Sequence, residues 1–467
     1  MLIVRNKKVG LILATVLVVL IIVGSFLLVN NSQPKDISCE DCNVVLIIVD
    51  TLRQDHLGTY GYFRDTSPNI DKLARESFVF DNAYSSSSWT RSAIASIVSS
   101  KSPSETQVYS ENKNDFLDDS FYTMQEYYNY KGYKTAAFYT SAHLDYGLVQ
   151  GFQETYPMYG GSKNNSSAEE VYFGVEQWID NRADTDKFFL LVHLIDPHPP
   201  YDFVLGFNFT GTSIYTSPKK FFPPGQDGVG SCDSKENITV LKDWQLQEME
   251  ANYDGEIAYT DDQIGKFIGY LKEEGLYHKT IIIITSDHGE EFLDHGGYWH
   301  GCTLYNELIK IPFMVHIPGL KSRRFFENVG TIDIFPTLID LQEPNSSQNY
   351  DLTGYSLLPL LNGKIKGIDW NTRPIFSATA FRGNLKYSLI FNGFKLVQYV
   401  DNKTIGLFDI DKDRGELNNL KIENQIEVYR NLLWNYIFGL DPAKNKDGGI
   451  ELSQEALDSL KSLGYVA

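Results

Sequence analysis

A buried strand that ends in an Asp-His pair constrains the fold of this chain more than any other stretch. Residues Ile281 to Thr285 are almost purely β-branched and apolar, which is typical of a strand covered on both faces. Asp287, His288 and Gly289 follow at once. Strands of open α/β sheets bind ligands beyond their carboxyl ends, and adjacent oxygen and nitrogen donors suit a divalent transition metal. The pattern indicates a metal site at a sheet edge, with a plain turn through Asp-His-Gly as the alternative.

Other segments of the chain alternate between strand and helix patterns. Strands are expected at 43–49, 135–139, 188–195 and 313–317, and helices after Pro68 and at 93–98, 169–181, 246–274 and 331–341. Gly255 and Pro336 are candidate breaks within the last two helices. Residues 202–240 are rich in Gly, Pro, Phe and Asn, and we expect a surface excursion that covers the site. This alternation predicts a doubly wound α/β domain.

The spacing of apolar residues changes from about Trp370 onward. Short alternating runs predict an antiparallel sheet, and helical patterns then close the chain; the runs are 374–379, 385–391, 394–400 and 405–409, and the helical patterns 423–437 and 452–462. We therefore expect a catalytic domain over 43–369 and a small C-terminal subdomain over 370–467.

The N-terminus carries an apolar run, residues 9–29, which is long enough to span a bilayer as a helix. Basic residues precede the run and no basic cluster follows it closely, so the positive-inside rule keeps the tail 1–8 cytoplasmic. A cleaved signal peptide is the alternative. We expect a single-pass protein of the cell membrane, with 30–42 as a linker and the catalytic domain extracytoplasmic.

Net charge, cysteine spacing and glycosylation acceptors restrict the possible partners and the location of the protein. The net charge is −19 with no basic block outside the N-terminus, which argues against a nucleic-acid partner. An anionic substrate must then be held by local positive groups or by a metal. Cys39 and Cys42 form a CxxC that lacks a second pair at zinc-site spacing, so a disulfide or two free thiols is favoured over half a metal site. Asn-x-Ser/Thr acceptors, among them Asn345, agree with an outside location.

Candidate chemistry thus gathers at Asp50, Thr90, Asp196 with His198, and Asp287 with His288. The surrounding stretches include NVVLIIVDTLRQDHLGTYGY, WTRSAIASIVSS, LIDPHPPY, TSDHGEEFLDHG, HGCTLYNELIKIPFMVHIPG and GLFDIDKDRGELNNL. With these motifs the chain resembles the sulfatase family of the alkaline-phosphatase superfamily, in family order over residues 43–467. The resemblance implies an α/β fold: a mixed central sheet flanked by helices, and a small C-terminal antiparallel-sheet subdomain.

The resemblance also assigns roles to particular residues. It places the nucleophile at Thr90, where a helix N-terminus favours an anionic group and a bound metal can lower the pKa of a hydroxyl; the alternative is a plain helix cap. The implied metal ligands are Asp50, Thr90, Asp287 and His288. The implied substrate-binding residues are Arg91, His198 and His300, with His143 a weaker candidate.

Several positions depart from the sulfatase pattern. Sulfatases convert a Cys or Ser at the nucleophile position to formylglycine, but here that position is Thr90. The usual second acidic residue after the first strand is Thr51. In an ungapped alignment, two sulfate-binding lysines are replaced by Ser141 and Gly301. These changes remove the aldehyde hydrate and positive charge from the site.

These departures favour phosphate esters over sulfate esters. A formylglycine hydrate expels sulfate by collapsing to the aldehyde, whereas a sulfated threonine has no such exit; a phosphorylated threonine can be resolved by in-line attack of water or an alcohol. The set resembles phosphoethanolamine transferases, lipoteichoic-acid synthases and phosphonate-ester hydrolases. The two-metal branch expects a His where Ala258 follows Asp254, so we expect one divalent ion, manganese or zinc ahead of calcium.

The first hypothesis is therefore a membrane-anchored metalloenzyme that cleaves or transfers phosphate esters, on a lipid-linked or glycan-linked anionic substrate. A sulfuric ester hydrolase is the second hypothesis. A catalytically inactive surface binding protein is the third, against which the intact ligand set speaks.

Overall fold

The computed structural model describes residues 37–159, 166–201, 204–207, 209, 241–363, 370, 372–400 and 403–439. Within these ranges no helix combines the length and the apolar character that a membrane crossing requires. The predicted membrane span at 9–29, most of the excursion at 202–240 and the helical pattern at 452–462 lie outside the described residues.

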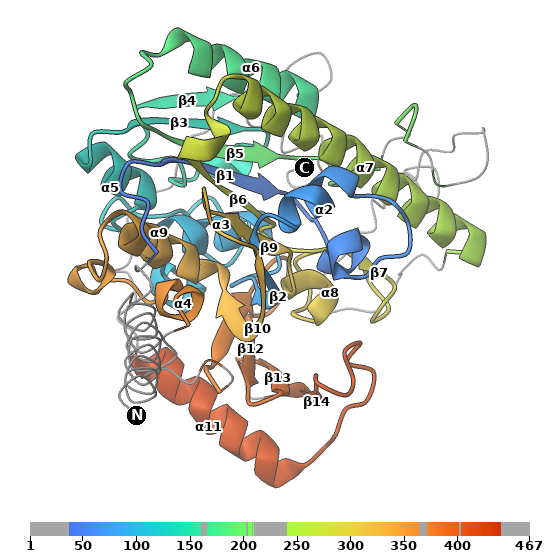
Figure 1. Ribbon diagram of the computed structural model, residues 1–467. Helices are drawn as coiled ribbons and strands as arrows, with labels where there is room; N and C mark the ends of the chain where they lie inside the picture. Colours follow the sequence, from blue (N-terminus) through green and yellow to red (C-terminus); the bar gives the residue numbers. More distant parts are fainter. Residues whose placement is uncertain are drawn as a thin grey trace, which may run out of the picture. The chain divides into compact units, whose positions relative to one another are not determined.

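An eight-stranded mixed sheet forms the centre of the fold, as predicted (Figure 1). Its order is β10-β2-β9-β6-β1-β5-β3-β4. Only β9 runs antiparallel to its neighbours β2 and β6, and the other pairs are parallel. The strands are β1 (Asn43–Val49), β2 (Phe78–Tyr84), β3 (Lys134–Tyr139), β4 (Glu154–Pro157), β5 (Phe188–Leu194), β6 (Thr280–Thr285), β9 (Phe313–His316) and β10 (Arg323–Gly330). Strands β2, β4 and β10 were not among those expected.

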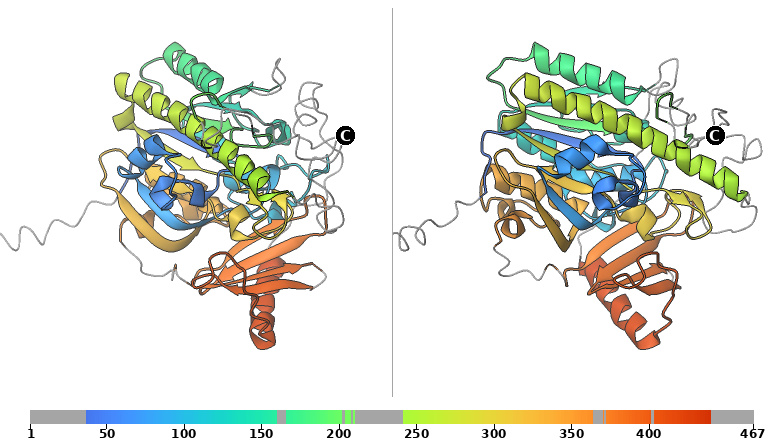
Figure 2. Two further views of the ribbon diagram at one scale, coloured as in Figure 1. Left: turned by 90° about the vertical axis from the view of Figure 1, so that its right-hand side faces the viewer. Right: turned by 45° about the vertical axis from the view of Figure 1, so that its right-hand side comes forward.

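Helices cover both faces of this sheet. On one face lie α2 (Pro68–Ala74), α6 (Ala168–Asn181) and α7 (Asp243–Glu273), with α6 and α7 side by side in Figure 2. Val45, Ile47 and Val49 of β1 belong to the core beneath them. The alternate residues of β1 point to the opposite face. The helices α3 (Thr90–Ser99), α5 (Met124–Tyr130) and α9 (Ile334–Gln342) pack against one another there.

Short helical turns connect these elements. They are α4 (Pro103–Thr106), α8 (Asn306–Ile309), α10 (Leu358–Leu361), η1 (Gln54–His56), η2 (Gly58–Tyr60), η3 (Ala142–Asp145), η5 (Tyr277–Lys279), η6 (Thr331–Asp333) and η7 (Ser347–Asn349). A two-stranded ribbon, β7 (Glu291–Phe292) with β8 (Tyr298–Trp299), follows β6.

The two expected helix breaks are wrong. Helix α7 continues through Gly255, where a Cβ would lie 2.5 Å from the carbonyl oxygen of Phe207. This glycine therefore permits a close approach of backbone rather than ending the helix. Pro336 lies in the first turn of α9, where a missing N–H costs no intrahelical hydrogen bond.

The C-terminal antiparallel sheet is confirmed as a meander of β11 (Ile375–Thr379), β12 (Lys386–Phe391), β13 (Phe394–Tyr399) and β14 (Thr404–Asp409). Helix α11 (Glu423–Gly439) packs Ile426, Tyr429 and Leu433 against it. The first strand of this sheet also contacts the catalytic domain. Ser377 Oγ donates to the carbonyl of Ser85 at 2.7 Å.

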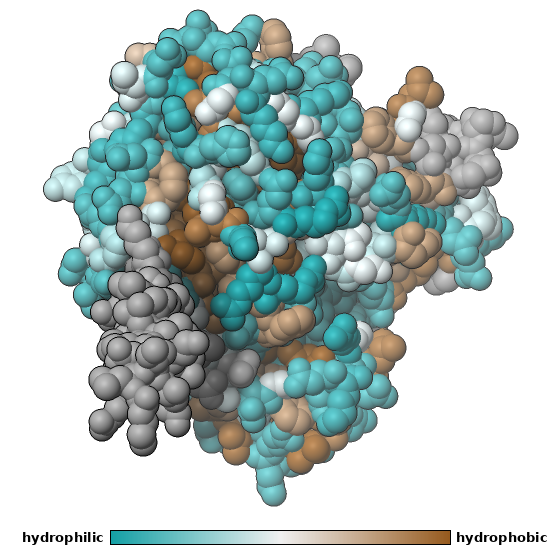
Figure 3. Space-filling model, viewed as in Figure 1, coloured by the Kyte–Doolittle hydropathy of each residue, from teal (hydrophilic) through white to brown (hydrophobic). Residues whose placement is uncertain are grey.

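One face of the molecule and the segment just before β1 each bear on an expectation from the sequence. Figure 3 shows a largely hydrophilic face on which apolar residues gather in small groups. Such a face is typical of solvent-exposed surface. Cys39 and Cys42 form a disulfide just before β1. That pairing excludes the half zinc site that a CxxC could also indicate.

Candidate active site and metal centre

The chemistry-bearing side chains converge at the carboxyl ends of β1, β5 and β6. Asp50 directly follows β1, and Asp287 and His288 follow β6 after Ser286. In the sheet register Ile48 of β1 lies opposite both Thr285 of β6 and His193 of β5. The parallel pairing therefore brings these groups to one edge, as the Asp-His pattern predicted.

The carboxylates of Asp50 and Asp287 and the imidazoles of His193 and His288 lie close enough together to bind one ion. Asp50 Oδ2 is 3.4 Å from His193 Nε2, and Asp50 Oδ1 is 3.6 Å from His288 Nε2. His288 Nε2 is also 3.5 Å from Asp287 Oδ2. Thr90 Oγ1 lies 3.2 Å from the same nitrogen. The predicted set of Asp50, Thr90, Asp287 and His288 is thus brought together.

The residues present fit a divalent ion. Both oxygens of Asp50, Asp287 Oδ2 and His193 Nε2 are buried without a hydrogen-bond partner. Two donor atoms bound tetrahedrally at about 2.1 Å from one ion lie about 3.4 Å apart. The observed separations match that spacing and are long for hydrogen bonds. Asp50, His193 and Asp287 form the described group of three residues whose ligand atoms all lie close enough to hold an ion.

The electrostatics of the carboxylates support the same conclusion. Burial raises the pKa of Asp50 well above its usual value, with Glu290 adding to the rise and Thr90 opposing it. Burial and the neighbouring Asp50 raise the pKa of Asp287 to about 6. Two buried carboxylates disfavour their charged forms in this way when no cation compensates them. A bound dication would supply the missing compensation.

His193 is a site residue that the sequence reasoning missed. It is the sixth of seven residues in an otherwise apolar strand, FFLLVHL, and periodicity alone places it in the core. A usable signal was present nonetheless. His193 is the one polar residue of this apolar run and lies near its carboxyl end, whereas the pairing of β5 with β1 is known only from the fold.

Thr90 begins α3, as the nucleophile assignment requires. The helix is buried along its whole length, and Trp89 precedes it in an extended conformation. The serine run before it is buried and held by β11, because Ala378 N donates to the carbonyl of Ser86 at 2.9 Å. The C-terminal sheet therefore helps to fix the position of the Thr90 hydroxyl.

His198 and His300 lie beside the candidate metal ligands. The His300 ring centroid is 4.5 Å from that of His288 and 4.9 Å from that of His198. His300 Nδ1 is 3.0 Å from Glu290 Oε1, and His198 Nδ1 is 2.7 Å from the carbonyl oxygen of Pro199. These contacts hold each ring by Nδ1. Burial, with Arg382 nearby, lowers the pKa of His300 to about 3.

Arg91 is placed differently from the expected anion clamp. Its NH1 donates to the carbonyls of Ser110, Asn112 and Asp115, the shortest at 2.7 Å. Its NH2 lies 3.3 Å from His143 Nδ1. The buried guanidinium thus ties the 110–115 loop to α3. Contact between Arg91 and substrate stays a prediction.

The positions of the two replaced lysines are occupied by backbone turns. Gly301 has φ +87, and a Cβ there would lie 2.4 Å from the Phe381 ring. No side chain is accommodated at that position without moving Phe381. Ser141 caps η3 by accepting from His143 N. Both positions therefore serve the local fold.

Asp254 does not contribute to the metal centre. Its carboxylate contacts His56 Nδ1 at 2.7 Å, Tyr62 Oη at 2.7 Å and the guanidinium of Arg64. The residue that a two-metal site would use is thus engaged elsewhere. This arrangement agrees with the expectation of a single ion.

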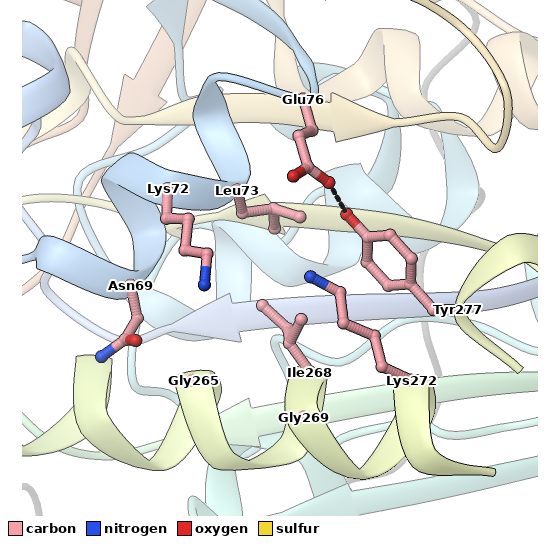
Figure 4. A pocket seen from close by; sticks show the side chains of 9 residues that line it. All are labelled: Asn69, Lys72, Leu73, Glu76, Gly265, Ile268, Gly269, Lys272 and Tyr277. Carbon is pink, nitrogen blue, oxygen red and sulfur yellow. Dashed lines mark hydrogen bonds between the residues drawn. The ribbon is translucent and has the colours of Figure 1, made fainter. Parts of the chain in front are cut away.

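A small cavity elsewhere brings two cationic side chains together but is lined by none of the candidate metal ligands. It lies between α2 and α7 and has a volume of about 100 Å³. In Figure 4, Lys72 and Lys272 point toward it while Glu76 accepts a hydrogen bond from Tyr277. None of Asp50, Thr90, His193, Asp287 and His288 lines this cavity. We therefore place the chemistry at the strand ends.

Comparisons with known proteins agree with this assignment. A family model described as Sulfatase matches residues 42–343, and one described as N-sulphoglucosamine sulphohydrolase, C-terminal, matches residues 294–440. Arylsulfatase K of Gallus gallus is 27% identical over 403 residues, covering 76% of this chain and 74% of the relative. Iduronate 2-sulfatase of Mus musculus is 25% identical over 354 residues, covering 64% of each.

Solved structures share the fold. The phosphonate monoester hydrolase of Agrobacterium radiobacter has a TM-score of 0.67 at 19% identity, covering 85% of this chain and 95% of that one. A protein solved with its substrate D-glucosamine-2-N,6-O-disulfate has a TM-score of 0.68 at 18% identity, covering 87% and 100%. At such identities the likeness establishes the fold alone.

Proposed function

The chain belongs to the sulfatase family, and from this premise we propose that it cleaves or transfers phosphorus esters through Thr90. The observation that carries the proposal is the Thr90 hydroxyl at the start of α3, 3.2 Å from His288 Nε2 and beside two buried carboxylates. The family's sulfate chemistry needs a formylglycine at this position, and threonine cannot supply one.

Each candidate site residue has a separate role in the proposed reaction. Thr90 Oγ1 attacks phosphorus, so that a bond from Thr90 to phosphorus forms and the bond to the leaving alcohol breaks; in-line attack of water or an acceptor alcohol on phosphorus then breaks the bond to Thr90 and restores its hydroxyl. The N-terminus of α3 lies beside the developing negative charge. His198 and His300, whose rings lie against one another and beside His288, would contact the reacting group. A divalent ion, when bound by Asp50, Asp287 and His288, would lower the pKa of the attacking hydroxyl and neutralise charge.

The charge of the site favours a substrate with one negative charge. Among the described residues, the guanidinium groups near the site are already engaged: Arg91 by loop carbonyls and Arg382 by Glu111 at 3.2 Å. A dication would be balanced by the carboxylates of Asp50 and Asp287. Little positive charge then remains for a second substrate charge. We therefore propose a phosphodiester or a phosphonate monoester rather than a dianionic phosphate monoester.

A panel of matched aryl esters tests this function. The purified protein is assayed with one aryl leaving group on a phosphodiester, a phosphonate monoester, a phosphate monoester and a sulfate ester, with manganese, zinc or calcium added. We expect kcat/KM to be highest for the mono-anionic phosphorus esters. A sulfate ester turned over fastest would contradict the proposal.

Sulfate-ester hydrolysis is the second candidate. The matching family models and curated relatives are sulfatases, and sulfate esters also carry one negative charge. That activity would need water rather than Thr90 as the direct nucleophile. The panel separates the two candidates because the leaving group is held constant.

We also propose that residues 9–29 tether the enzyme in the cell membrane with residues 43–467 outside. The apolar run and the basic residues before it support this topology. Protease added to intact cells should digest the catalytic domain. Protection until the cells are lysed would reverse the orientation, and release of the intact domain into the medium would favour a cleaved signal peptide.

A further inference from the structure

We propose that His193 is a metal ligand and that it takes the place left by the missing second carboxylate after β1. It would give this site two nitrogen donors and make it selective for zinc over calcium and magnesium. The inference concerns the metal of the proposed function, but its test needs no turnover.

The residue after Asp50 cannot supply the charge that the sulfatase pattern has there. Thr51 turns the chain with φ 57, and its Oγ1 is buried without a hydrogen-bond partner. Its backbone N–H points to Asp287 Oδ1 at 3.4 Å. Thr51 thus forms a backbone turn at the position where the sulfatase pattern has its second carboxylate, but it carries no carboxylate itself.

The tautomer of His193 follows from its surroundings. Thr140 Oγ1 donates its single proton to the carbonyl of His193 at 3.1 Å. The same oxygen lies 3.4 Å from His193 Nδ1 and can accept from it, which is the tautomer we assign. Nδ1 then carries the proton and Nε2 carries a lone pair. That lone pair faces Asp50 Oδ2 at 3.4 Å.

His288 is arranged in the same way. Its Nδ1 lies 2.9 Å from the carbonyl oxygen of Gly289, which can only accept, so its Nε2 also carries a lone pair. Metal-bound histidines are usually held like this, with the second ring nitrogen donating to a carbonyl or hydroxyl. Two imidazole lone pairs and two carboxylates therefore meet in one buried place. Lone pairs facing carboxylate oxygens without a proton between them repel, unless a cation lies there.

The donor set determines which cation is favoured. Calcium, magnesium and manganese favour carboxylate, carbonyl and water oxygens, whereas imidazole nitrogen suits zinc. Two imidazoles are neutral donors, so a dication bound by Asp50 and Asp287 leaves a site without net charge. Replacing a carboxylate by His193 thus changes both the softness and the charge of the site relative to an all-oxygen set.

The test measures metal binding directly. The purified full-length protein is stripped with a chelator, dialysed against equimolar zinc, manganese, calcium and magnesium, and its bound metal is determined by elemental analysis. Wild type should retain about one zinc per chain. His193→Ala should weaken zinc binding by more than the ~10–100-fold that loss of an outer contact causes. His193→Asp should move the preference toward calcium.

His316→Ala is the matched control, since His316 is a buried strand histidine on β9 that contacts the carbonyl of Glu76. Its zinc affinity should equal that of wild type. Should the His193 variants fail to fold, X-ray absorption on zinc-loaded wild type counts the bound imidazoles. Two imidazoles support the proposal. One imidazole, or a His193→Ala protein with unchanged zinc affinity, overturns it whatever ester the enzyme cleaves.

Discussion

Thr90→Ala should lower turnover by about 10⁴-fold or more, which corresponds to about 5 kcal/mol of transition-state stabilisation. The substitution removes the attacking oxygen and, with it, a candidate metal ligand. Thr90→Ser keeps the hydroxyl at the start of α3 and should retain much of the activity. Thr90→Cys should not rescue in the same way, because a thiolate prefers softer metals. Steady-state kinetics with the best aryl phosphorus ester measures all three.

Ser99→Ala is the matched control for Thr90→Ala. Ser99 lies at the other end of the same helix, and its hydroxyl donates to the carbonyl of Ala95 at 2.6 Å. Its loss should leave turnover near that of wild type. Near-normal turnover in Thr90→Ala would show that a water attacks the substrate, and the argument against sulfate esters would then lose its main support.

Asp287→Asn and His288→Ala should abolish metal binding and turnover together while the domain stays folded. Both side chains are fully buried at the end of β6, and their candidate ligand atoms, Asp287 Oδ2 and His288 Nε2, face each other. Removing a direct ligand should weaken binding by more than about 10²-fold, the upper range for outer contacts. In wild type, adding metal to chelated protein should raise Tm, because an ion that binds the folded state stabilises it.

Both variants should lose this metal-dependent rise in Tm but keep the cooperative unfolding transition. Asp340→Asn is the control, since Asp340 is a buried carboxylate of α9 that accepts from Ser347 N at 2.8 Å. Its response to metal should match wild type. Full metal occupancy in Asp287→Asn and His288→Ala would disprove the assignment of these ligands.

The parts of the site that local sequence determines were predictable. The apolar run before Asp287 forces a buried strand, and the side chains directly after such a strand must lie at the sheet edge. Asp50 after β1 follows from the same reasoning. The C-terminal meander was readable because its alternating runs are separated by turns.

Features that depend on strand order or on loop packing were not predictable. His193 lies at the site because β5 neighbours β1, and no local pattern gives that order. Strand β4 has a largely exposed face, so it lacks the apolar run that marks a buried strand. Arg91 adjoins the nucleophile in sequence, yet its direction is set by the carbonyls of the 110–115 loop. Such contacts join segments whose pairing only the folded chain reveals.

The central claim is that Thr90 forms a covalent bond to phosphorus, and one measurement tests it most directly. The protein is mixed with an aryl phosphorus ester, quenched in acid during steady-state turnover, digested, and its peptides are analysed by mass spectrometry. The account predicts a phosphorus adduct on the peptide that contains Thr90, absent from Thr90→Ala and absent when metal is removed. An active enzyme that shows no adduct on Thr90, or an adduct on another residue, would contradict it.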